Sequence, residues 1–449
     1  MLRRMFILGL DSAPPKTIYE RYGVEIPNIA ELVDESERYL MRTSHPPITI
    51  PAWMSMFTGK TPGELGIYGF RHRKPGDVGH SYIINYNYIK HRTLWDEVGS
   101  RGGRVGVFGV PPTYPPRPVK GFMISDFMTP SHESQYSFPP WLKKEVENRF
   151  GPLIFDIVYR SEDKKGVRRD LFNMTRQHLE VVKYLAGMKP WDLFVYVEIG
   201  IDRLHHAFWK YFDVSHPRYT EDPELSKAVP EFYKMIDEGV GELREKLPED
   251  TIFVIVSDHG IKSMTGAFAV NEWLIQQGYL HLKEKPRKPG VDLTREMVDW
   301  DNTLAWGWGG YYSRIFVNLR GREPSGVVGR EEYEDLLNQL ARDISRIKGP
   351  ENQQWINVAL KPGDIYPEVN GDPPDLLAYF DNLNWRAAGT IGYESPYLSE
   401  NDRGPDDAVH DWHGVFTVYD PEGTVSKGMK GEKPIEKIKE RLIELILKD

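Results

Sequence analysis

The segment "TIFVIVSDHG" at residues 251–260 contains the clearest strand pattern in the sequence. It contains an unbroken run of β-branched and aromatic residues (252–256), which is more typical of a buried strand than of a helix. Asp258 and His259 follow at the end of this run, and both have side chains that can bind a metal ion. Because ligands of open α/β sheets bind beyond the carboxyl ends of the strands, the segment predicts both a sheet and a site at its edge.

Apolar segments of the same kind recur along the chain. They lie at residues 5–11, 104–110, 192–202, 313–321 and 374–381. Amphipathic segments lie between them, for example residues 231–247, whose apolar side chains fall on one helical face. Strands that alternate with helices predict an α/β fold with a large, mostly parallel sheet and helices on both of its faces.

Two stretches break this alternation. Residues 112–165 are rich in proline, serine and aromatic side chains, and residues 282–312 combine proline and charged residues with "AWGWGGYY". We expect both stretches to be insertions or small cap elements over a site in the core.

The composition narrows the possible functions. The chain has 449 residues, of which 40% are hydrophobic and 27% are charged, as in ordinary globular proteins. Its net charge of -9 argues against a protein that wraps duplex nucleic acid. There is no cysteine, so any metal site must use histidine, carboxylate or hydroxyl ligands.

The sequence also predicts a location. No run of 18 apolar residues is present, so we expect no membrane span. The apolar run at residues 5–10 is too short for the core of a signal peptide and ends at Asp11. We therefore expect a cytoplasmic protein.

Acidic residues end three of the predicted strands, at Asp11, Asp202 and Asp258. A single aspartate in this position is more often a helix cap or a turn residue. Here, however, His259 follows Asp258 directly, and His206 lies four residues after Asp202, the spacing of one helical turn. Carboxylates that meet at one sheet edge repel one another unless cations lie between them, so the combination points to a metal site.

A candidate nucleophile is Thr49, which lies in a proline-flanked turn before an apolar helix pattern. A hydroxyl at a helix N-terminus lies near free backbone N–H groups, which favour a bound phosphate. The alternative interpretation is an ordinary threonine helix cap.

The motifs "GLD" (9–11), "TIPAW" (49–53), "TGKTPGELGI" (58–67) and "SDHG" (257–260), together with the Asp202–His206 spacing, resemble the alkaline phosphatase superfamily. Within it the chain is most similar to the type I phosphodiesterase/nucleotide pyrophosphatase group, in particular its archaeal and bacterial predicted phosphohydrolase/phosphomutase branch. The resemblance covers most of the chain. It implies a single alkaline-phosphatase-like catalytic domain over residues 1–449.

The resemblance also implies two divalent metal ions, zinc above all and manganese as the alternative. One ion would be held by Asp11, Thr49, Asp258 and His259, and the other by Asp202, His206 and a histidine near the C-terminus. Two such ions can bind both the attacking and the leaving oxygen of an in-line displacement. Thr49 would then be the catalytic nucleophile.

The C-terminal ligand could be either histidine of "AVHDWHGVFTVYD" at residues 408–420. In an extended segment, residues three apart face opposite ways, so one ion cannot readily use both. The pattern of the phosphohydrolase/phosphomutase branch selects His410, whereas that of the eukaryotic-type diesterases selects His413. We expect His410 to be the ligand and His413 to lie next to it, facing the substrate.

One departure from the family concerns the phosphate. Eukaryotic-type diesterases have a phosphate-contacting asparagine where this chain has Phe70. We expect the neighbouring Arg71 to bind the substrate instead, although an ordinary surface arginine is the alternative. Sulfatases are disfavoured because their nucleophile motif is missing, and phosphoethanolamine transferases because membrane spans are missing.

The predicted function is a two-metal phosphodiesterase or related hydrolase of small-molecule phosphoesters, acting through a phosphothreonine. The alternatives are a phosphomutase of the cofactor-independent phosphoglycerate mutase type, a phosphomonoesterase, and a non-catalytic binding protein. The sequence does not predict the oligomeric state. A group of aromatic residues could stack on a nucleobase or pack inside a cap: Trp53, Tyr68, Trp306, Trp308, Tyr311 and Tyr312.

Overall fold

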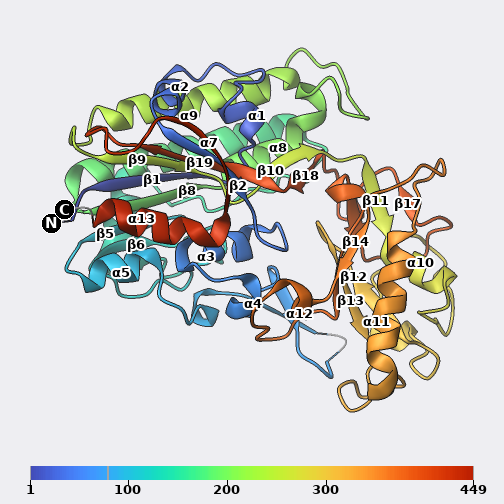
Figure 1. Cartoon of the computed structure of the whole chain (residues 1–449). Helices are drawn as coiled ribbons and strands as arrows, with labels where there is room; N and C mark the ends of the chain where they lie inside the picture. The colour runs from blue at the N-terminus through green and yellow to red at the C-terminus, as the bar shows by residue number, and fades with distance from the viewer. Residues whose placement is uncertain (1, 78–79, 448–449) are drawn as a thin grey trace.

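A nine-stranded sheet forms the centre of the larger of two lobes (Figure 1). The computed structural model describes residues 2–77 and 80–447. In the sheet, β1 (Met5–Leu10) lies between β8 (Leu193–Glu198) and β9 (Ile252–Val256) and is parallel to both. Every residue of these three strands is buried, as expected for parallel strands that are covered on both faces.

The remaining strands extend this centre on both sides. On the β8 side they are β5 (Val105–Phe108), β6 (Gly121–Ile124) and the antiparallel edge strand β7 (Ser137–Phe138). On the β9 side they are β19 (His413–Tyr419), β2 (Glu37–Arg42) and β20 (Gly428–Pro434), with β19 antiparallel to both of its neighbours. The predicted α/β fold with a mostly parallel sheet is confirmed.

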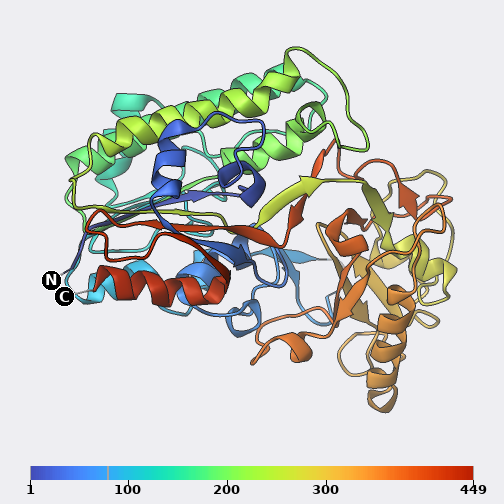
Figure 2. The ribbon, with the colours of Figure 1, turned by 45° about the horizontal axis from the view of Figure 1, so that its top comes forward.

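Successive side chains of β1 point to opposite faces of the sheet, where helices cover them. Phe6 and Leu8 belong to one buried cluster and Met5 and Ile7 to the other. The first cluster contains the helices α2 (Pro27–Asp34), α6 (Trp141–Phe150), α7 (Lys164–Met188), α8 (Gly200–Phe212) and α9 (Ala228–Arg244). The second contains α3 (Thr49–Thr58), α5 (Leu94–Ser100) and α13 (Ile438–Ile446), which lie on the opposite side of the sheet (Figure 2).

A smaller lobe has its own sheets and its own buried cluster (Figure 1). Its antiparallel sheet has the order β12 (Ala305–Trp308), β13 (Ser313–Val317), β15 (Leu376–Tyr379) and β14 (Val358–Leu360). A second sheet contains β16 (Trp385–Ala388), β11 (Gly266–Ala269) and β17 (Tyr397–Leu398). The helices α10 (Val270–Gln276) and α11 (Arg330–Ser345) pack on these sheets.

The chain enters the smaller lobe through β10 (Gly260–Ser263) and leaves it through β18 (Ala408–Asp411). These two strands pair with each other in antiparallel fashion, so the beginning and the end of the lobe are held together. The smaller lobe is therefore one long excursion between His259 and His410, two of the predicted metal ligands.

The two stretches expected to be insertions have different places in the structure. Residues 282–312 form only part of the smaller lobe, and the apolar strands predicted at 313–321 and 374–381 also belong to that lobe rather than to the main sheet. Residues 112–165 are no separate cap, because they supply β6, β7 and α6 at the edge of the main lobe. Their last part, residues 151–163, is irregular chain.

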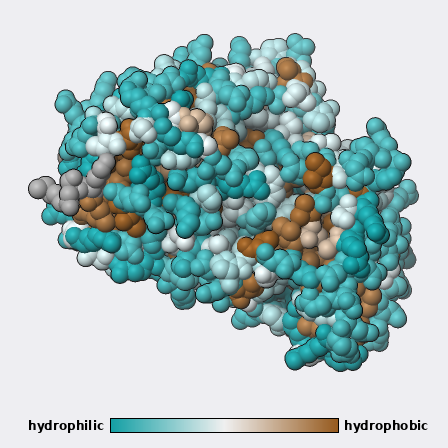
Figure 3. Space-filling model, viewed as in Figure 1, coloured by the Kyte–Doolittle hydropathy of each residue, from teal (hydrophilic) through white to brown (hydrophobic). Residues whose placement is uncertain are grey.

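Short elements complete the described chain: α1 (Pro15–Ile18), α4 (Pro62–Leu65), α12 (Pro362–Ile365), β3 (Arg71–Arg73) and β4 (Ser81–Ile83). None of the helices in the described residues is long and apolar enough to cross a membrane. The face of the molecule shown in Figure 3 is mostly hydrophilic, and hydrophobic side chains gather on it where the two lobes meet.

Candidate metal centre

The three aspartates at the strand ends meet at one edge of the main sheet. Asp11 follows β1, Asp258 follows β9, and Asp202 lies in the first turn of α8, directly after β8. Because β9, β1 and β8 are adjacent and parallel, their carboxyl ends point to the same edge. All three carboxylates are buried, with at most 2% of each residue exposed.

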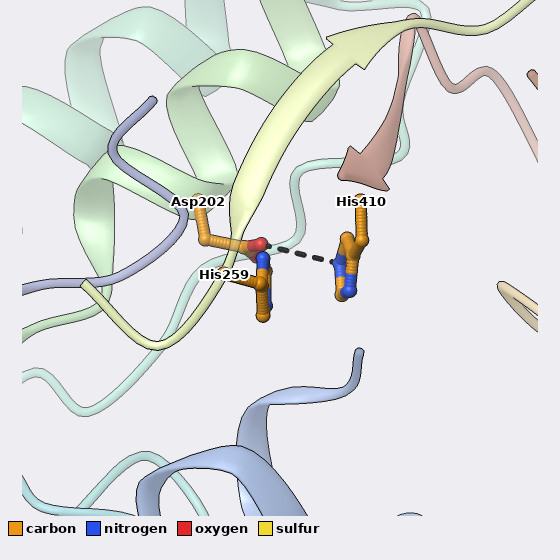
Figure 4. A group of neighbouring side chains, drawn as sticks. All are labelled: Asp202, His259 and His410. Carbon is orange, nitrogen blue, oxygen red and sulfur yellow. Dashed lines mark ion pairs between the residues drawn. The ribbon is translucent and has the colours of Figure 1, made fainter. Parts of the chain in front are cut away.

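Two groups of side chains could each hold a metal ion. One consists of Asp202, His259 and His410, and the other of Asp11, Asp258 and His259; within each group the ligand atoms lie within 4.8 Å of one another. Figure 4 shows the first group, with His410 on β18 facing Asp202 and His259. Nε2 of His410 lies 3.7 Å from Oδ1 of Asp202.

The atoms that converge in these groups are buried, and none has a partner in hydrogen-bond geometry among the described residues, although some lie 3.2–3.3 Å from one another or from His206. They are Asp11 Oδ1, Asp202 Oδ1, Asp258 Oδ2, His259 Nε2 and His410 Nε2. A buried polar atom without a partner costs about 1–3 kcal/mol, and more when it is charged. Five such atoms, all of types that coordinate divalent metals and gathered at one point, fit a metal centre.

The second polar atom of each carboxylate is held by the protein. Oδ2 of Asp11 accepts a hydrogen bond of 2.8 Å from the Trp53 indole, and Oδ2 of Asp202 accepts one of 2.6 Å from Arg203. Oδ1 of Asp258 accepts from the backbone N–H of Ser12 at 3.2 Å. These contacts fix each carboxylate so that its free oxygen is directed at the cluster.

In His259 and His410, likewise, one ring nitrogen contacts the protein and the other faces the cluster. Nδ1 of His259 contacts the carbonyl of Gly260 at 3.0 Å, and Nδ1 of His410 contacts the carbonyl of Pro47 at 2.6 Å. A carbonyl can only accept, so each Nδ1 must carry the proton and each Nε2 must have a free lone pair. This is the arrangement in which histidine binds metals.

His206 is oriented by a carboxylate instead of a carbonyl. Its Nδ1 lies 2.7 Å from Oδ1 of Asp406, and its Nε2 lies 3.3 Å from Oδ1 of Asp202 and 3.1 Å from the Tyr311 hydroxyl. Burial disfavours its charge, but the two carboxylates outweigh burial and raise the pKa of His206 to about 10. The imidazole therefore sits where positive charge is strongly favoured.

The pKa values of the three carboxylates are shifted by their burial and by the charges close to them. Burial and the charge of Asp202 raise the pKa of Asp11, and burial and the charge of Asp11 raise the pKa of Asp258. The pKa of Asp202 is lowered although burial opposes this, because His206 and Arg203 stabilise its charge. Mutual repulsion at a buried point is what a divalent cation would relieve.

Thr49 is the first residue of α3 and is 98% buried, with 2% exposed. The cap residue is Ile48, so the alternative interpretation of Thr49 as the helix cap does not hold. Two neighbours place this end of α3 against the cluster: Pro47 accepts the hydrogen bond from His410, and Trp53, one turn further along, donates to Asp11. Gly9 makes room for the Trp53 ring, since a Cβ there would lie 2.6 Å from it.

The structure separates the two histidines of the C-terminal segment. His410 is fully buried in the cluster, whereas the His413 side chain on β19 is 36% exposed and pairs with Glu432 at 2.6 Å. His413 is therefore not brought to the site, and the expectation that it faces the substrate beside His410 was wrong. Arg71 lies exposed on β3, on the wall of a cavity beside the cluster.

Four residues of the site were not predicted as such. Arg203 and Asp406 orient Asp202 and His206, and Arg160 donates to Asp406 at 3.0 Å. Tyr311 was predicted only as a cap or stacking residue, yet its ring stacks on His410 at 3.7 Å. Of these, only Arg203 had a local signal, since it is next to Asp202 in the sequence.

Comparisons with known proteins give the family of the chain and solved structures with a similar fold. The family model described as type I phosphodiesterase/nucleotide pyrophosphatase matches residues 5–414. No curated protein sequence matches the chain significantly.

Solved structures with the same fold include murine ectonucleotide pyrophosphatase/phosphodiesterase 5 in an inactive form in complex with AMP, with a TM-score of 0.57 and 12% identity. They also include the same murine protein on its own (TM-score 0.54, 13% identity) and the human one (TM-score 0.54, 12% identity). Each match covers 99% of this chain and 95% of the other. At such identities the likeness shows the fold alone.

Proposed function

Because the chain belongs to the type I phosphodiesterase/nucleotide pyrophosphatase family, and is therefore a phosphoester hydrolase, we propose that it works with two divalent metal ions and a phosphothreonine intermediate at Thr49. The observation that carries the proposal is the convergence of five buried, unpartnered ligand atoms next to the N-terminus of α3. Zinc is the proposed metal and manganese the alternative, since both suit a site made of carboxylates and imidazoles.

The residues that would hold the ions fall into two sets that share one edge of the sheet. Asp11, Asp258 and His259 would hold one ion together with the Thr49 hydroxyl. Asp202, His206 and His410 would hold the other. When bound, such ions lower the pKa of a coordinated hydroxyl or water and neutralise charge on phosphoryl oxygens.

The protein's own residues position the reaction. The Thr49 oxygen attacks phosphorus, a new O–P bond forms and the bond to the leaving oxygen breaks, while the hydroxyl proton passes to solvent and the leaving group takes up a proton. Water then attacks phosphorus, the bond between phosphorus and the Thr49 oxygen breaks, and a proton from that water regenerates the hydroxyl. Free N–H groups at the start of α3 can hold phosphoryl oxygens in line with Thr49.

Two further hydrogen-bond donors, Tyr311 and Arg160, lie next to His206. The Tyr311 hydroxyl is 3.1 Å from Nε2 of His206, and Arg160 donates to that hydroxyl at 2.8 Å. Both can donate hydrogen bonds to an oxygen that gains negative charge. These residues come from different lobes, so the site depends on the contact between the lobes.

The proposal is tested by hydrolysis of bis-p-nitrophenyl phosphate with zinc or manganese, beside the monoester p-nitrophenyl phosphate and a nucleotide panel. The panel includes nucleotides because one structural neighbour is a complex with AMP. Preferred diester hydrolysis that depends on metal supports the proposal. Preferred monoester hydrolysis would indicate a phosphomonoesterase, and phosphoryl transfer within a substrate without net hydrolysis would indicate a mutase.

A further inference from the structure

A cavity of about 1060 Å³ lies between the two lobes, beside the ligand cluster. Arg160 belongs to its wall and joins it to the cluster, because the Tyr311 hydroxyl that accepts from Arg160 also contacts His206. A substrate whose ester phosphate lies at the cluster could therefore extend into this cavity.

The wall of this cavity carries more positive than negative side chains. Among the residues that the structure describes, five arginines and three carboxylates line it. Arg160 is paired with Asp406 at 2.9 Å. Arg403 is paired with Asp292, which also lines the cavity. These two arginines have their charge compensated by the protein.

Three arginines of the wall, Arg71, Arg314 and the exposed Arg295, are not compensated in this way, and Arg71 and Arg314 lie next to each other. In the described part of the chain none of the three guanidinium groups has a carboxylate at ion-pair distance, and Arg314 instead donates to the backbone carbonyl of Arg71. Nε of Arg314 is buried without a partner, and burial lowers the pKa of this residue. The Arg314 guanidinium lies over the Trp308 ring, 5.0 Å from its centroid, which offsets only part of the cost of its burial. A half-buried arginine without an anion on a cavity wall therefore favours an anionic ligand.

We propose that Arg71 and Arg314 bind a second phosphate of the substrate, carried by the leaving group, while the ester phosphate lies at the ligand cluster. The inference rests on the proposed function, since it names the substrate class of the same site. Arginine suits this task because its planar fork of N–H donors matches phosphate oxygens. Arg71 is on β3 of the main lobe and Arg314 on β13 of the smaller lobe, so the bound phosphate would bridge the lobes.

Kinetic selectivity tests the proposal. We compare kcat/KM for substrates whose leaving group carries phosphate, ATP and fructose 1,6-bisphosphate, with that for bis-p-nitrophenyl phosphate, whose leaving group carries none. The selectivity ratio is kcat/KM for a substrate with phosphate in its leaving group divided by kcat/KM for bis-p-nitrophenyl phosphate. Arg71→Gln and Arg314→Gln should each lower this ratio by about tenfold or more, mainly by raising KM for the first substrate. A selective loss with ATP alone would identify a nucleotide polyphosphate, and a selective loss with the sugar alone a sugar bisphosphate; either supports the proposal.

The matched control is Arg403→Gln, which removes an arginine of the same wall whose charge is already paired with Asp292. This variant should change the ratio by less than about twofold, since its guanidinium is compensated by the protein. An equal fall of the ratio in the Arg403 variant would overturn the assignment to Arg71 and Arg314. An equal loss of activity toward all substrates in the Arg71 and Arg314 variants would overturn it as well.

A binding measurement separates this inference from the proposed function. Titration calorimetry with inorganic tripolyphosphate, in the presence of a chelator, reports on the arginines without turnover. The double variant Arg71→Gln/Arg314→Gln should bind at least about tenfold more weakly than the wild type. If tripolyphosphate binding depends on the two arginines but the protein hydrolyses no ester, the proposed function is refuted and the phosphate-binding role of Arg71 and Arg314 stands. If the wild type hydrolyses bis-p-nitrophenyl phosphate but the wild type and the double variant bind tripolyphosphate equally well, the phosphate-binding role of the two arginines is refuted and the proposed function stands.

Discussion

The carbonyl oxygen of Pro47 accepts a hydrogen bond of 2.6 Å from Nδ1 of His410, across 363 positions of the sequence. This single contact joins the turn before the proposed nucleophile Thr49 to the strand on which the chain returns from the smaller lobe. It also fixes which nitrogen of His410 is free for the cluster. The positions of nucleophile and ligand are therefore coupled.

Replacing Thr49 with alanine should abolish turnover while leaving the metal content unchanged. The other six proposed ligands remain, so we expect at least about a thousandfold loss in kcat with both ions still bound. Thr49→Ser keeps a hydroxyl at the same place and serves as the control, with far more activity than the alanine variant. Activity of Thr49→Ala close to the wild type would remove this residue from the mechanism.

The two C-terminal histidines should behave differently when each is replaced by alanine. His410→Ala should lose one metal ion per chain and most of its activity, because His410 Nε2 faces Asp202 and His259. His413→Ala should keep both ions and change stability by less than about 1 kcal/mol, since the pair with Glu432 is partly exposed. Metal analysis of the two purified variants decides between them, and metal loss in the His413 variant would contradict the structure.

Asp406 should matter to metal binding although it is not a proposed ligand. Asp406→Asn should weaken the hydrogen bond to Nδ1 of His206. Residues that orient a metal-binding histidine in this way typically contribute 10–100-fold to metal affinity or activity. The matched control is Asp407→Asn, the adjacent buried carboxylate, which lies 3.3 Å from Lys210. Competition with a zinc chelator measures the affinity of each variant. Equal affinities would show that Asp406 only stabilises the fold.

Removal of the metal should lower thermal stability. A bound ion at a thousand times its dissociation constant stabilises the folded chain by about 4 kcal/mol, which for a chain of 449 residues corresponds to roughly 4 °C in the unfolding midpoint. Chelation should therefore lower Tm by that amount, and added zinc or manganese should restore it. An Asp258→Asn variant should respond less. A Tm that does not change on chelation in the wild type would contradict a metal held by buried ligands.

The ligands themselves could be predicted because their signals are local. Asp11 and Asp258 follow runs of apolar strand residues, and the spacing of Asp202 and His206 is that of a helical turn. Parallel strands then bring these positions to one sheet edge, as the structure shows. The choice of His410 over His413 came from the family resemblance rather than from a physical signal in the segment.

The residues around the ligands could not be predicted, because their contacts depend on how the smaller lobe folds. Asp406 lies 200 positions from His206, and Tyr311 lies 105 positions from it. The extent of the smaller lobe was also missed. Its strands β13 and β15 are short apolar runs, and nothing in their sequence distinguishes them from strands of the main sheet.

The metal content of the protein decides whether the buried ligands hold two divalent ions. Purified without chelator and dialysed against trace zinc or manganese, the wild-type chain should contain two divalent ions, measured by mass spectrometry of the elements against protein concentration. Replacing Asp258 and His259 together should reduce this to one ion, and replacing Asp202 and His410 together should do the same. A wild-type chain that retains no divalent ion under these conditions would exclude the two-metal site.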